Sequence, residues 1–308
     1  MTIIDGKKVA SEIRLELKAE VDKLKSAGKP VPGLVAILVG DNPASEVYVR
    51  SKGKACEEIG MNSKTEKLPS EITEKELLEV IAKYNADNNF NGILVQLPLP
   101  KHINEEKIIE AILPEKDVDG FHPVNVGSLV IGKDTLLPCT PAGIQELIVR
   151  YQIPIKGKHV VVVGRSNIVG KPIANILLQK KENANAIVTV CHSAARDISS
   201  FTKQADILIA AIGQPNFIRG DMVSEGVVVI DVGINRVTES SHPKGSKIVG
   251  DVDYDEVSKK ASFITPVPGG VGPMTIAMLL KNTFKAYLIQ NSLSKADTPL
   301  TDKVKSQK

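Results

Sequence analysis

The feature that most constrains the fold is residues 160–172, VVVVGRSNIVGKP, where an apolar run gives way to glycine and then to a helical pattern. Four consecutive valines predict a fully buried parallel strand. The strand ends at Gly164, and apolar residues at helical spacing begin after Gly170. A strand, a glycine turn and a helix N-terminus leave backbone N–H groups free to bind a phosphate. Because the spacing departs from G-x-G-x-x-G, a plain strand-to-helix turn is the alternative.

The next strand indicates which dinucleotide such a loop would bind. Residues 186–191 (AIVTVC) lie where a Rossmann unit carries the residue that faces the adenosine ribose. An NAD site has Asp or Glu there, whereas this chain has His192 and Ser193, with Arg165 in the glycine loop. The missing carboxylate and the guanidinium favour the 2′-phosphate of NADP over NAD. The alternative is that Arg165 is an ordinary solvated loop residue.

Length and composition limit the class of protein. A chain of 308 residues suits two domains with separate cores. Its net charge of +3 is spread evenly, so we expect no nucleic-acid partner. Three cysteines without a C-x-x-C pair, and histidines without ligand spacing, predict neither a disulfide framework nor a metal site. Without a signal-peptide pattern or a membrane-length apolar run, we expect a cytoplasmic protein that binds no membrane.

The first 130 residues alternate helical and strand patterns, which is typical of an α/β layer domain. Helical patterns cover residues 6–27, the stretch from Pro43 to Gly60, a stretch opening at the Thr73 and Glu76 capping box, and 105–112; strand patterns cover 33–39, 62–68 and 92–97. Later strands are predicted at 159–163, 186–191, 206–210 and 227–232, with a short one at Val249; residues 263–266 lead into a loop, and a last helix is predicted over 274–289.

These patterns predict two α/β domains with a cleft between them. The Pro-rich residues 137–141 mark the crossing, so the first domain covers 1–138 and the second, a Rossmann-like mostly parallel sheet, covers 139–273. We expect the helix at 274–290 to pack back on the first domain. The basic tail, residues 291–308, lacks apolar periodicity and is predicted to be disordered.

One helix carries a candidate acid or base. Tyr48 and Lys52 are four residues apart and therefore neighbours on a helix face, which Ala55 and Ile59 continue. A lysine on the side that a helix normally buries loses hydration and becomes usable in proton transfer, with Tyr48 as a hydrogen-bonding neighbour. The alternative is a lysine whose stem snorkels past the edge of an apolar stripe.

Polar residues at strand ends are further candidates. Gln96 interrupts the apolar run 92–97, and a buried amide there has to be satisfied at the carboxyl end of the strand, where open α/β sheets bind ligands. Asp117 and Asp119 lie in a turn-rich loop, where either can cap a turn or accept from a ligand N–H group. They have no third ligand that would indicate a metal.

Two glycine-containing stretches complete the candidates. Residues 266–272 (PVPGGVG) either let the backbone approach a flat ligand closely or form a tight interdomain turn. Residues 231–235 (DVGIN) end a strand at the ligand-binding edge. Asp231 as a structural cap and Ile234 as a wall of a nicotinamide pocket are both consistent with that position.

Taken together, seven stretches closely resemble the bifunctional methylenetetrahydrofolate dehydrogenase/cyclohydrolase family, over about residues 1–290. They are Tyr48–Lys52 (YVRSK), Val95–Leu99 (VQLPL), Pro114–Gly120 (PEKDVDG), Pro138–Pro141 (PCTP), Val163–Ser166 (VGRS), Asp231–Asn235 (DVGIN) and Ile264–Met274 (ITPVPGGVGPM). The last two are highly specific in combination. The resemblance implies oxidation of 5,10-methylenetetrahydrofolate with NADP⁺, then hydrolysis of the methenyl product to 10-formyltetrahydrofolate in one-carbon metabolism.

The resemblance also implies residue roles and a partner. Lys52 becomes the general acid/base of the hydrolysis, Tyr48 and Gln96 hold it, and Asp119 binds the pterin. The substrate contacts implied are Tyr48, Lys52, Val95, Gln96, Leu97, Asp119 and the loop from Pro268 through Gly269 and Gly270 to Gly272; the cofactor contacts are Gly164, Arg165, Ser166, Ile168, Ser193 and Ile234. The family is similar in forming homodimers through its cofactor domains.

The chemistry fits these residues, and two rival functions fit less well. Hydride transfer needs a held geometry rather than an ionisable group, whereas hydrolysis needs proton transfers that one lysine can supply. A short-chain dehydrogenase also has Tyr-x-x-x-Lys, but there the glycine loop precedes the lysine, and here Lys52 precedes Gly164. A non-catalytic NADP sensor would not need an acid/base site.

Overall fold

The computed structural model describes residues 1–238 and 245–291. Within them the chain forms two compact units, a larger unit (residues 1–19 and 119–280) and a smaller unit (residues 20–118 and from 281 on). Helices α1 (Gly6–Ser26) and α10 (Val271–Gln290) each contribute residues to both units. Residues 292–308, which belong to the tail predicted to be disordered, lie outside the described residues.

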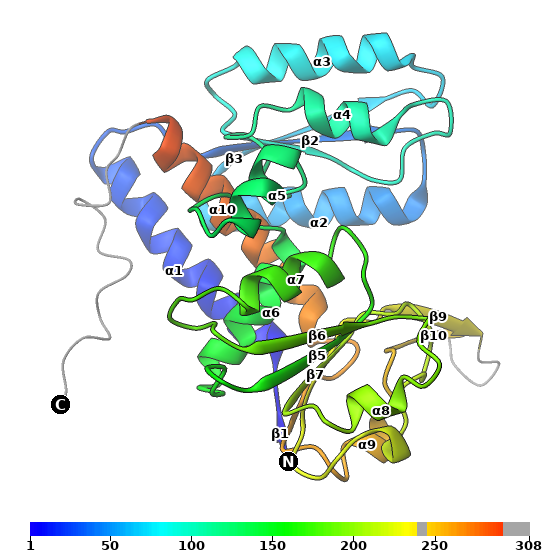
Figure 1. Ribbon diagram of the computed structural model, residues 1–308. Helices are drawn as coiled ribbons and strands as arrows, with labels where there is room; N and C mark the ends of the chain where they lie inside the picture. The colour runs from blue at the N-terminus through cyan, green and yellow to red at the C-terminus, as the bar shows by residue number, and fades with distance from the viewer. Residues whose placement is uncertain (239–244, 292–308) are drawn as a thin grey trace. The chain divides into compact units, whose positions relative to one another are not determined.

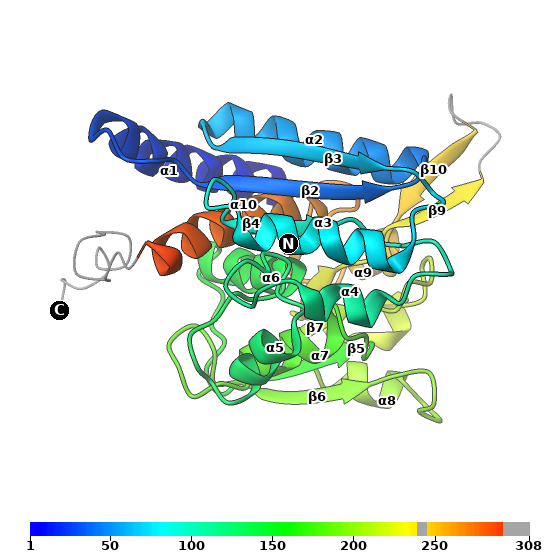
Figure 2. The same ribbon diagram turned by 90° about the horizontal axis from the view of Figure 1, so that it is seen from above.

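The smaller unit is a three-stranded parallel sheet between helices, as the alternating patterns predict. Its centre is β2 (Gly33–Val39), entirely buried because its six apolar residues and one glycine pack on both faces. The neighbours are β3 (Asn62–Leu68) and β4 (Gly92–Val95), and Figure 2 shows β3 beside β2. Helix α2 (Pro43–Ile59) covers one face, and α3 (Glu74–Ala86) and α4 (Glu105–Ala111) cover the other (Figure 1).

The ends of these helices confirm the sequence-based boundaries. Asn42 caps α2 by accepting from the backbone N–H groups of residues 44 and 45, and Gly60 ends it with a φ of 82°. Thr73 and Glu76 form the predicted reciprocal capping box of α3. Local patterns therefore determine where the helix that carries Lys52 begins and ends.

The larger unit is built on a six-stranded sheet, ordered β1-β11-β8-β7-β5-β6, in which every pairing is parallel. The strands are β1 (Thr2–Ile3), β5 (His159–Val163), β6 (Ile187–Cys191), β7 (Ile207–Ala210), β8 (Val228–Asp231) and β11 (Phe263–Ile264). This is the doubly wound arrangement expected for the second domain. The chain order reverses at β5, between β6 and β7, and ligands bind at such switch points.

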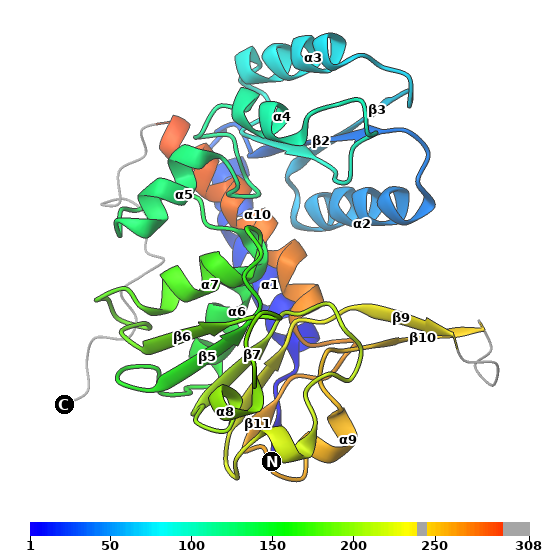
Figure 3. The ribbon, with the colours of Figure 1, turned by 45° about the vertical axis from the view of Figure 1, so that its right-hand side comes forward.

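Helices cover both faces of this sheet. Helix α6 (Cys139–Arg150) and α7 (Gly170–Leu177) lie on one side of β5, β6 and β7, and the short helices α8 (Ser199–Thr202) and α9 (Tyr254–Val257) lie on the other (Figures 1 and 3). A separate antiparallel pair is formed by β9 (Asn235–Thr238) and β10 (Ser246–Val249). A 3₁₀ turn, η1 (Gly220–Met222), follows β7.

Some element boundaries differ from the predictions. The strand predicted over 92–97 ends at Val95, so Gln96 follows it instead of lying within it. Helices α5 (Pro123–Val130) and α6 were not predicted, because their prolines read as loop signals. Pro123 and Pro141 lie in first turns, where the missing N–H group has no helical partner to lose. Pro273 explains in the same way why α10 begins at Val271 rather than at residue 274.

Candidate functional sites

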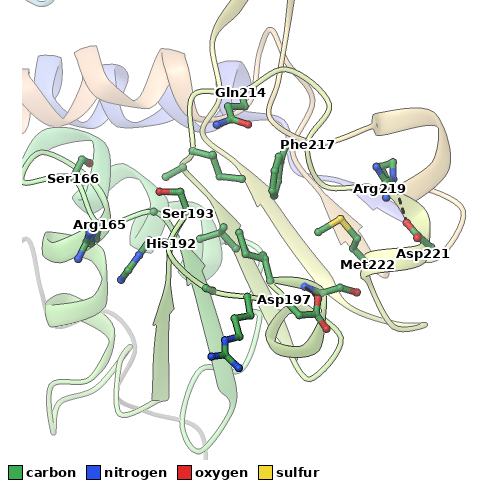
Figure 4. A pocket seen from close by; sticks show the side chains of 18 residues that line it. Arg165, Ser166, His192, Ser193, Asp197, Gln214, Phe217, Arg219, Asp221 and Met222 are labelled. Carbon is green, nitrogen blue, oxygen red and sulfur yellow. Dashed lines mark hydrogen bonds and ion pairs between the residues drawn. The ribbon is translucent and has the colours of Figure 1, made fainter.

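The larger unit contains a cavity of about 610 Å³ at the carboxyl ends of β5, β6 and β7 (Figure 4). It lies at the switch point of the sheet, where an open α/β fold binds its ligand. Four predicted cofactor residues line it: Gly164, Arg165, Ser166 and Ser193. Ile168 and Ile234 lie outside the lining and are exposed, so their contact with a cofactor stays a prediction.

The glycine loop of this cavity is shaped by backbone contacts. Gly164 has a φ of 125°, and a Cβ atom there would overlap the carbonyl oxygen of Ala211. A Cβ atom on Gly170 would overlap the carbonyl oxygen of Gly164. The Ser166 hydroxyl accepts from the backbone N–H groups of Val169 (3.1 Å) and Gly170 (3.3 Å), at the start of α7. This tight cradle at a helix N-terminus fits the phosphates of a dinucleotide.

Several lining residues were not singled out from the sequence. Ile198, Phe217 and Met222 supply an apolar part of the cavity, and Arg196 and Arg219 supply charge. They lie in the segments after β6 and β7. Their position just beyond the ends of predicted strands was the only feature of the sequence that could have indicated a place in a binding site. A ring-shaped apolar group can pack in this part of the cavity while the glycine loop holds phosphates.

Asp231 at the end of β8 is a structural residue. Its buried carboxylate accepts from the backbone N–H groups of Gly233 (2.9 Å), Asp251 (2.9 Å) and Val252 (3.0 Å). Burial raises the pKa of Asp231 to about 6. The buried carboxylate of Asp251 accepts in turn from the N–H groups of Ile212 (2.6 Å) and Gly213 (2.9 Å), so the pair fixes the segment after β7 that lines the cavity.

In the smaller unit, Lys52 on α2 is joined to Gln96 at the end of β4. The Lys52 Nζ donates to the Gln96 Oε1 at 3.0 Å, and the Gln96 Nε2 donates to the Leu97 carbonyl oxygen at 2.7 Å. The second bond determines which side of the amide faces the lysine, because only the nitrogen can donate to a carbonyl. Both side chains are half-buried, as expected for a polar pair beyond a strand end.

Tyr48 lies one turn before Lys52 and is 50% exposed. In the described part of the chain, its hydroxyl makes no hydrogen bond to Lys52 or to any other residue. Tyr48 and Lys52 are therefore neighbours on α2, as predicted. The predicted hydrogen bond between them is not formed in the described part of the chain. Val95 is buried at the end of β4, and Leu97 follows Gln96 with a cis peptide bond to Pro98.

The loop that leads to Asp119 is anchored by a buried lysine. Lys116 is 3% exposed, and its Nζ donates to the carbonyl oxygens of Tyr84 (3.0 Å) and Asp87 (2.8 Å) at the end of α3. Burial lowers the pKa of Lys116. The Asn282 side chain donates to the Val118 carbonyl oxygen at 2.8 Å. The backbone just before the half-buried Asp119 is therefore fixed.

The second glycine loop is also tightly packed. Gly269 has a φ of 114°, and Val267 and Pro268 are joined by a cis peptide bond. A Cβ atom on Gly6, at the start of α1, would overlap the carbonyl oxygen of Gly270. A Cβ atom on Gly270 would lie 2.6 Å from the carbonyl oxygen of Pro266, whereas a Cβ atom on Gly272 would meet only the Ile234 side chain, at 3.7 Å. Backbone conformation and close packing therefore account for Gly269 and Gly270 but not for Gly272. Contact of Pro268, Gly269 and Gly270 with a substrate stays a prediction.

The described residues contain neither a cluster that could bind a metal nor a helix that could span a membrane. No group of three or more His, Cys, Asp or Glu side chains there could hold a metal ion. None of the helices described is both long enough and apolar enough to span a bilayer.

Comparison with known proteins identifies the family. Residues 4–119 match the catalytic domain of tetrahydrofolate dehydrogenase/cyclohydrolase, and residues 138–291 match its NAD(P)-binding domain. The chain is 57% identical to the bifunctional protein FolD of Chlorobium phaeobacteroides over 298 residues, which covers 96% of this chain and 100% of that protein.

Solved structures agree with this match. A bifunctional FolD methylenetetrahydrofolate dehydrogenase/cyclohydrolase from Campylobacter jejuni superposes with a TM-score of 0.89 at 54% identity, over 94% of this chain and 99% of that one. The Trypanosoma brucei enzyme complexed with NADP cofactor and inhibitor superposes with a TM-score of 0.88 at 41% identity, over 95% and 98%. The α/β fold with a parallel cofactor-type sheet and the predicted resemblance are both confirmed. The chain belongs to the tetrahydrofolate dehydrogenase/cyclohydrolase family.

Proposed function

We propose that this protein oxidises 5,10-methylenetetrahydrofolate with NADP⁺ and hydrolyses the methenyl product to 10-formyltetrahydrofolate. The observation that carries the proposal is the Lys52–Gln96 hydrogen bond of 3.0 Å, within a segment that matches the family's catalytic domain. We place the boundary between the folate-binding domain and the NADP-binding domain between residues 138 and 139. The helix at 274–290 is assigned to the folate-binding domain.

The dehydrogenase step requires the chain to hold a cofactor in place. Bound NADP⁺ supplies the hydride acceptor. Gly164, Arg165, Ser166 and Ser193 would hold it, and the cradle described above fits its phosphates. The protein's part is then orientation and exclusion of water, which needs no ionisable residue at the transferred hydrogen.

The cyclohydrolase step requires proton transfers. When water adds to the methenyl carbon, Lys52 in its amine form accepts the proton that the water loses. Lys52 then returns that proton to the pterin nitrogen as the carbon–nitrogen bond breaks, the hydroxyl of the adduct releases its proton to solvent, and the resulting formyl group stays on the other nitrogen. Gln96 holds the Lys52 Nζ from one side. The exposed Tyr48 hydroxyl and Asp119 are the groups proposed to contact the substrate.

A homodimer and a cytoplasmic location are part of the same proposal. Strand β6 is one of the two edge strands of the larger unit's sheet, and its Ile187 (64%) and Val190 (41%) are exposed. An apolar edge strand readily pairs with another chain, and this supports a dimer through the cofactor domains. Sedimentation equilibrium of the full chain tests it, because a monomer at micromolar concentration would contradict it.

The experiment for the main proposal replaces Lys52. Lys52→Met should lower the rate of methenyltetrahydrofolate hydrolysis by about 10²–10⁴-fold, because the proton acceptor is lost. Lys54→Met is the matched control, since Lys54 lies on the same helix with its side chain 75% exposed and only a 3.9 Å contact to Glu58. Loss of the methenyl absorbance measures the rate, and wild-type hydrolysis by Lys52→Met would exclude the assigned role.

A further inference from the structure

The cofactor cavity contains more positive charge than its own acidic residues balance. Arg165, Arg196 and Arg219 line it, and the acidic lining residues are Asp197 and Asp221. The Arg219 Nε lies 3.4 Å from the Asp221 Oδ1, an ion pair drawn as a dashed line in Figure 4. The positive charge of Arg219 is therefore already paired with the Asp221 carboxylate.

The second acidic residue is engaged elsewhere. The Asp197 Oδ1 accepts from the backbone N–H of Ser199 at 2.9 Å, where α8 begins. Neither Arg165 nor Arg196 has an ion pair or a side-chain hydrogen bond to any of the described residues, and both are exposed. Two arginines that line the cavity thus have no side-chain partner within the described part of the chain, and unpaired positive charge in a cavity favours the binding of an anion.

Strand pairing brings the two arginine-bearing loops together. Val163 is in register with Cys191, and the Gly164 N–H donates to the Cys191 carbonyl oxygen at 2.8 Å. Arg165 therefore follows β5, and residues 192–196 follow β6, at adjacent positions on the sheet edge. Figure 4 shows Arg165, His192 and Ser193 on this side of the cavity.

The turn before Arg196 has a defined shape. The Ala194 N–H donates to the His192 Nδ1 at 3.2 Å, and the Ala195 N–H donates to the His192 carbonyl oxygen at 2.8 Å. His192 thus fixes the direction in which the chain leaves β6. Arg196 comes directly after this turn, in the segment where a Rossmann unit contacts the adenosine ribose.

We propose that Arg196 is a second specificity-determining residue, which binds the 2′-phosphate of NADP together with Arg165. This inference rests on the proposed NADP-dependent function and goes beyond it by assigning a residue outside the motifs. A phosphate monoester carries a charge of about −1.5 to −2 at pH 7, so one guanidinium leaves it only partly neutralised. Two arginines match that charge, and each can form paired hydrogen bonds with phosphate oxygens.

The test measures binding and not turnover. Isothermal titration calorimetry on the full chain compares 2′,5′-ADP with 5′-AMP, two ligands that differ only in the 2′-phosphate. Arg196→Gln should weaken 2′,5′-ADP about tenfold, the effect of losing one charge-assisted contact, and change 5′-AMP less than twofold. Arg165→Gln should act in the same direction, and the double variant should bind the two ligands nearly equally.

The control removes the same charge outside the cavity. Lys203 is exposed just after α8 and does not line the cavity, so Lys203→Gln reports the long-range effect of one charge. If Arg196→Gln weakens 2′,5′-ADP no more than Lys203→Gln, or weakens both ligands equally, the assignment of Arg196 is wrong. If the wild type shows no preference for 2′,5′-ADP, the NADP preference itself fails, which is a distinguishable result.

Discussion

The two candidate sites differ in what forms them, backbone geometry in one and a side-chain hydrogen bond in the other. The cavity of the larger unit depends on backbone geometry, since Gly164 turns the chain where no Cβ atom fits. The site of the smaller unit depends on one hydrogen bond between two side chains, Lys52 and Gln96. The difference predicts how each responds to substitution. In the cavity of the larger unit, side-chain changes should adjust ligand selectivity, and only a change of backbone conformation should abolish binding. In the site of the smaller unit, replacing one side chain should be enough to abolish activity.

The largest effect is expected from Gly164→Ala. The new Cβ would overlap the Ala211 carbonyl oxygen, and alanine rarely adopts a φ of 125°, so the loop has to move. We expect 2′,5′-ADP binding to weaken on the order of a thousandfold, or about 4 kcal/mol. Gly127→Ala is the control, because it lies in α5 with no atom within 4 Å of the added Cβ. Unchanged binding by Gly164→Ala would show that side chains alone build the cavity.

The glycine loop also shows what sequence patterns can predict. Strand β5 and the start of α7 follow from residues 159–172 alone, because four consecutive valines and two glycines leave few conformations. The capping residues Asn42 and Thr73 are equally local signals. Elements whose cause lies within about ten residues of chain were therefore predicted with correct boundaries or nearly so.

Contacts between distant residues could not be predicted in this way. Gln96 was selected because it is polar beside an apolar run, but its bond to Lys52 joins positions 44 residues apart. Only the family resemblance linked them beforehand. Lys116 appeared as a loop residue, although its ammonium is held by α3 carbonyls about 30 residues earlier. Arg196 could not be selected from the sequence. Its proposed role depends on which nearby carboxylates are already paired with other residues in the folded protein.

A smaller effect is expected at the support of the cavity, Asp231. Its pKa is raised from 3.8 to about 6 by burial, so between these values the folded state binds a proton that the unfolded state has released. The free energy of unfolding that Asp231 contributes therefore falls as pH rises from about 4 to 6, by about 3 kcal/mol. Asp231→Asn removes this titration. The variant should gain about that much relative to wild type between pH 4 and pH 7, measured by urea unfolding at each pH.

The control for this pH dependence is Asp255→Asn, the same change at an exposed position of α9. It should leave the pH profile of unfolding parallel to that of wild type. A parallel profile for Asp231→Asn as well would mean that the three backbone N–H groups keep Asp231 ionised throughout. The carboxylate would then be a permanent anion that holds the cavity wall and not a titrating group.

The smallest effect separates stability from chemistry in the smaller unit. Thr73→Ala removes the capping box of α3, so the free energy of unfolding should fall by about 1 kcal/mol, while Thr73→Ser should keep most of it. Helix α3 contributes neither Lys52 nor Gln96, and hydrolysis of methenyltetrahydrofolate should stay within twofold of wild type. Urea unfolding and methenyl absorbance measure the two quantities on one preparation. A large loss of hydrolysis in Thr73→Ala would mean that general destabilisation is enough to disable the site, and the loss in Lys52→Met would then no longer identify the lysine as the proton acceptor.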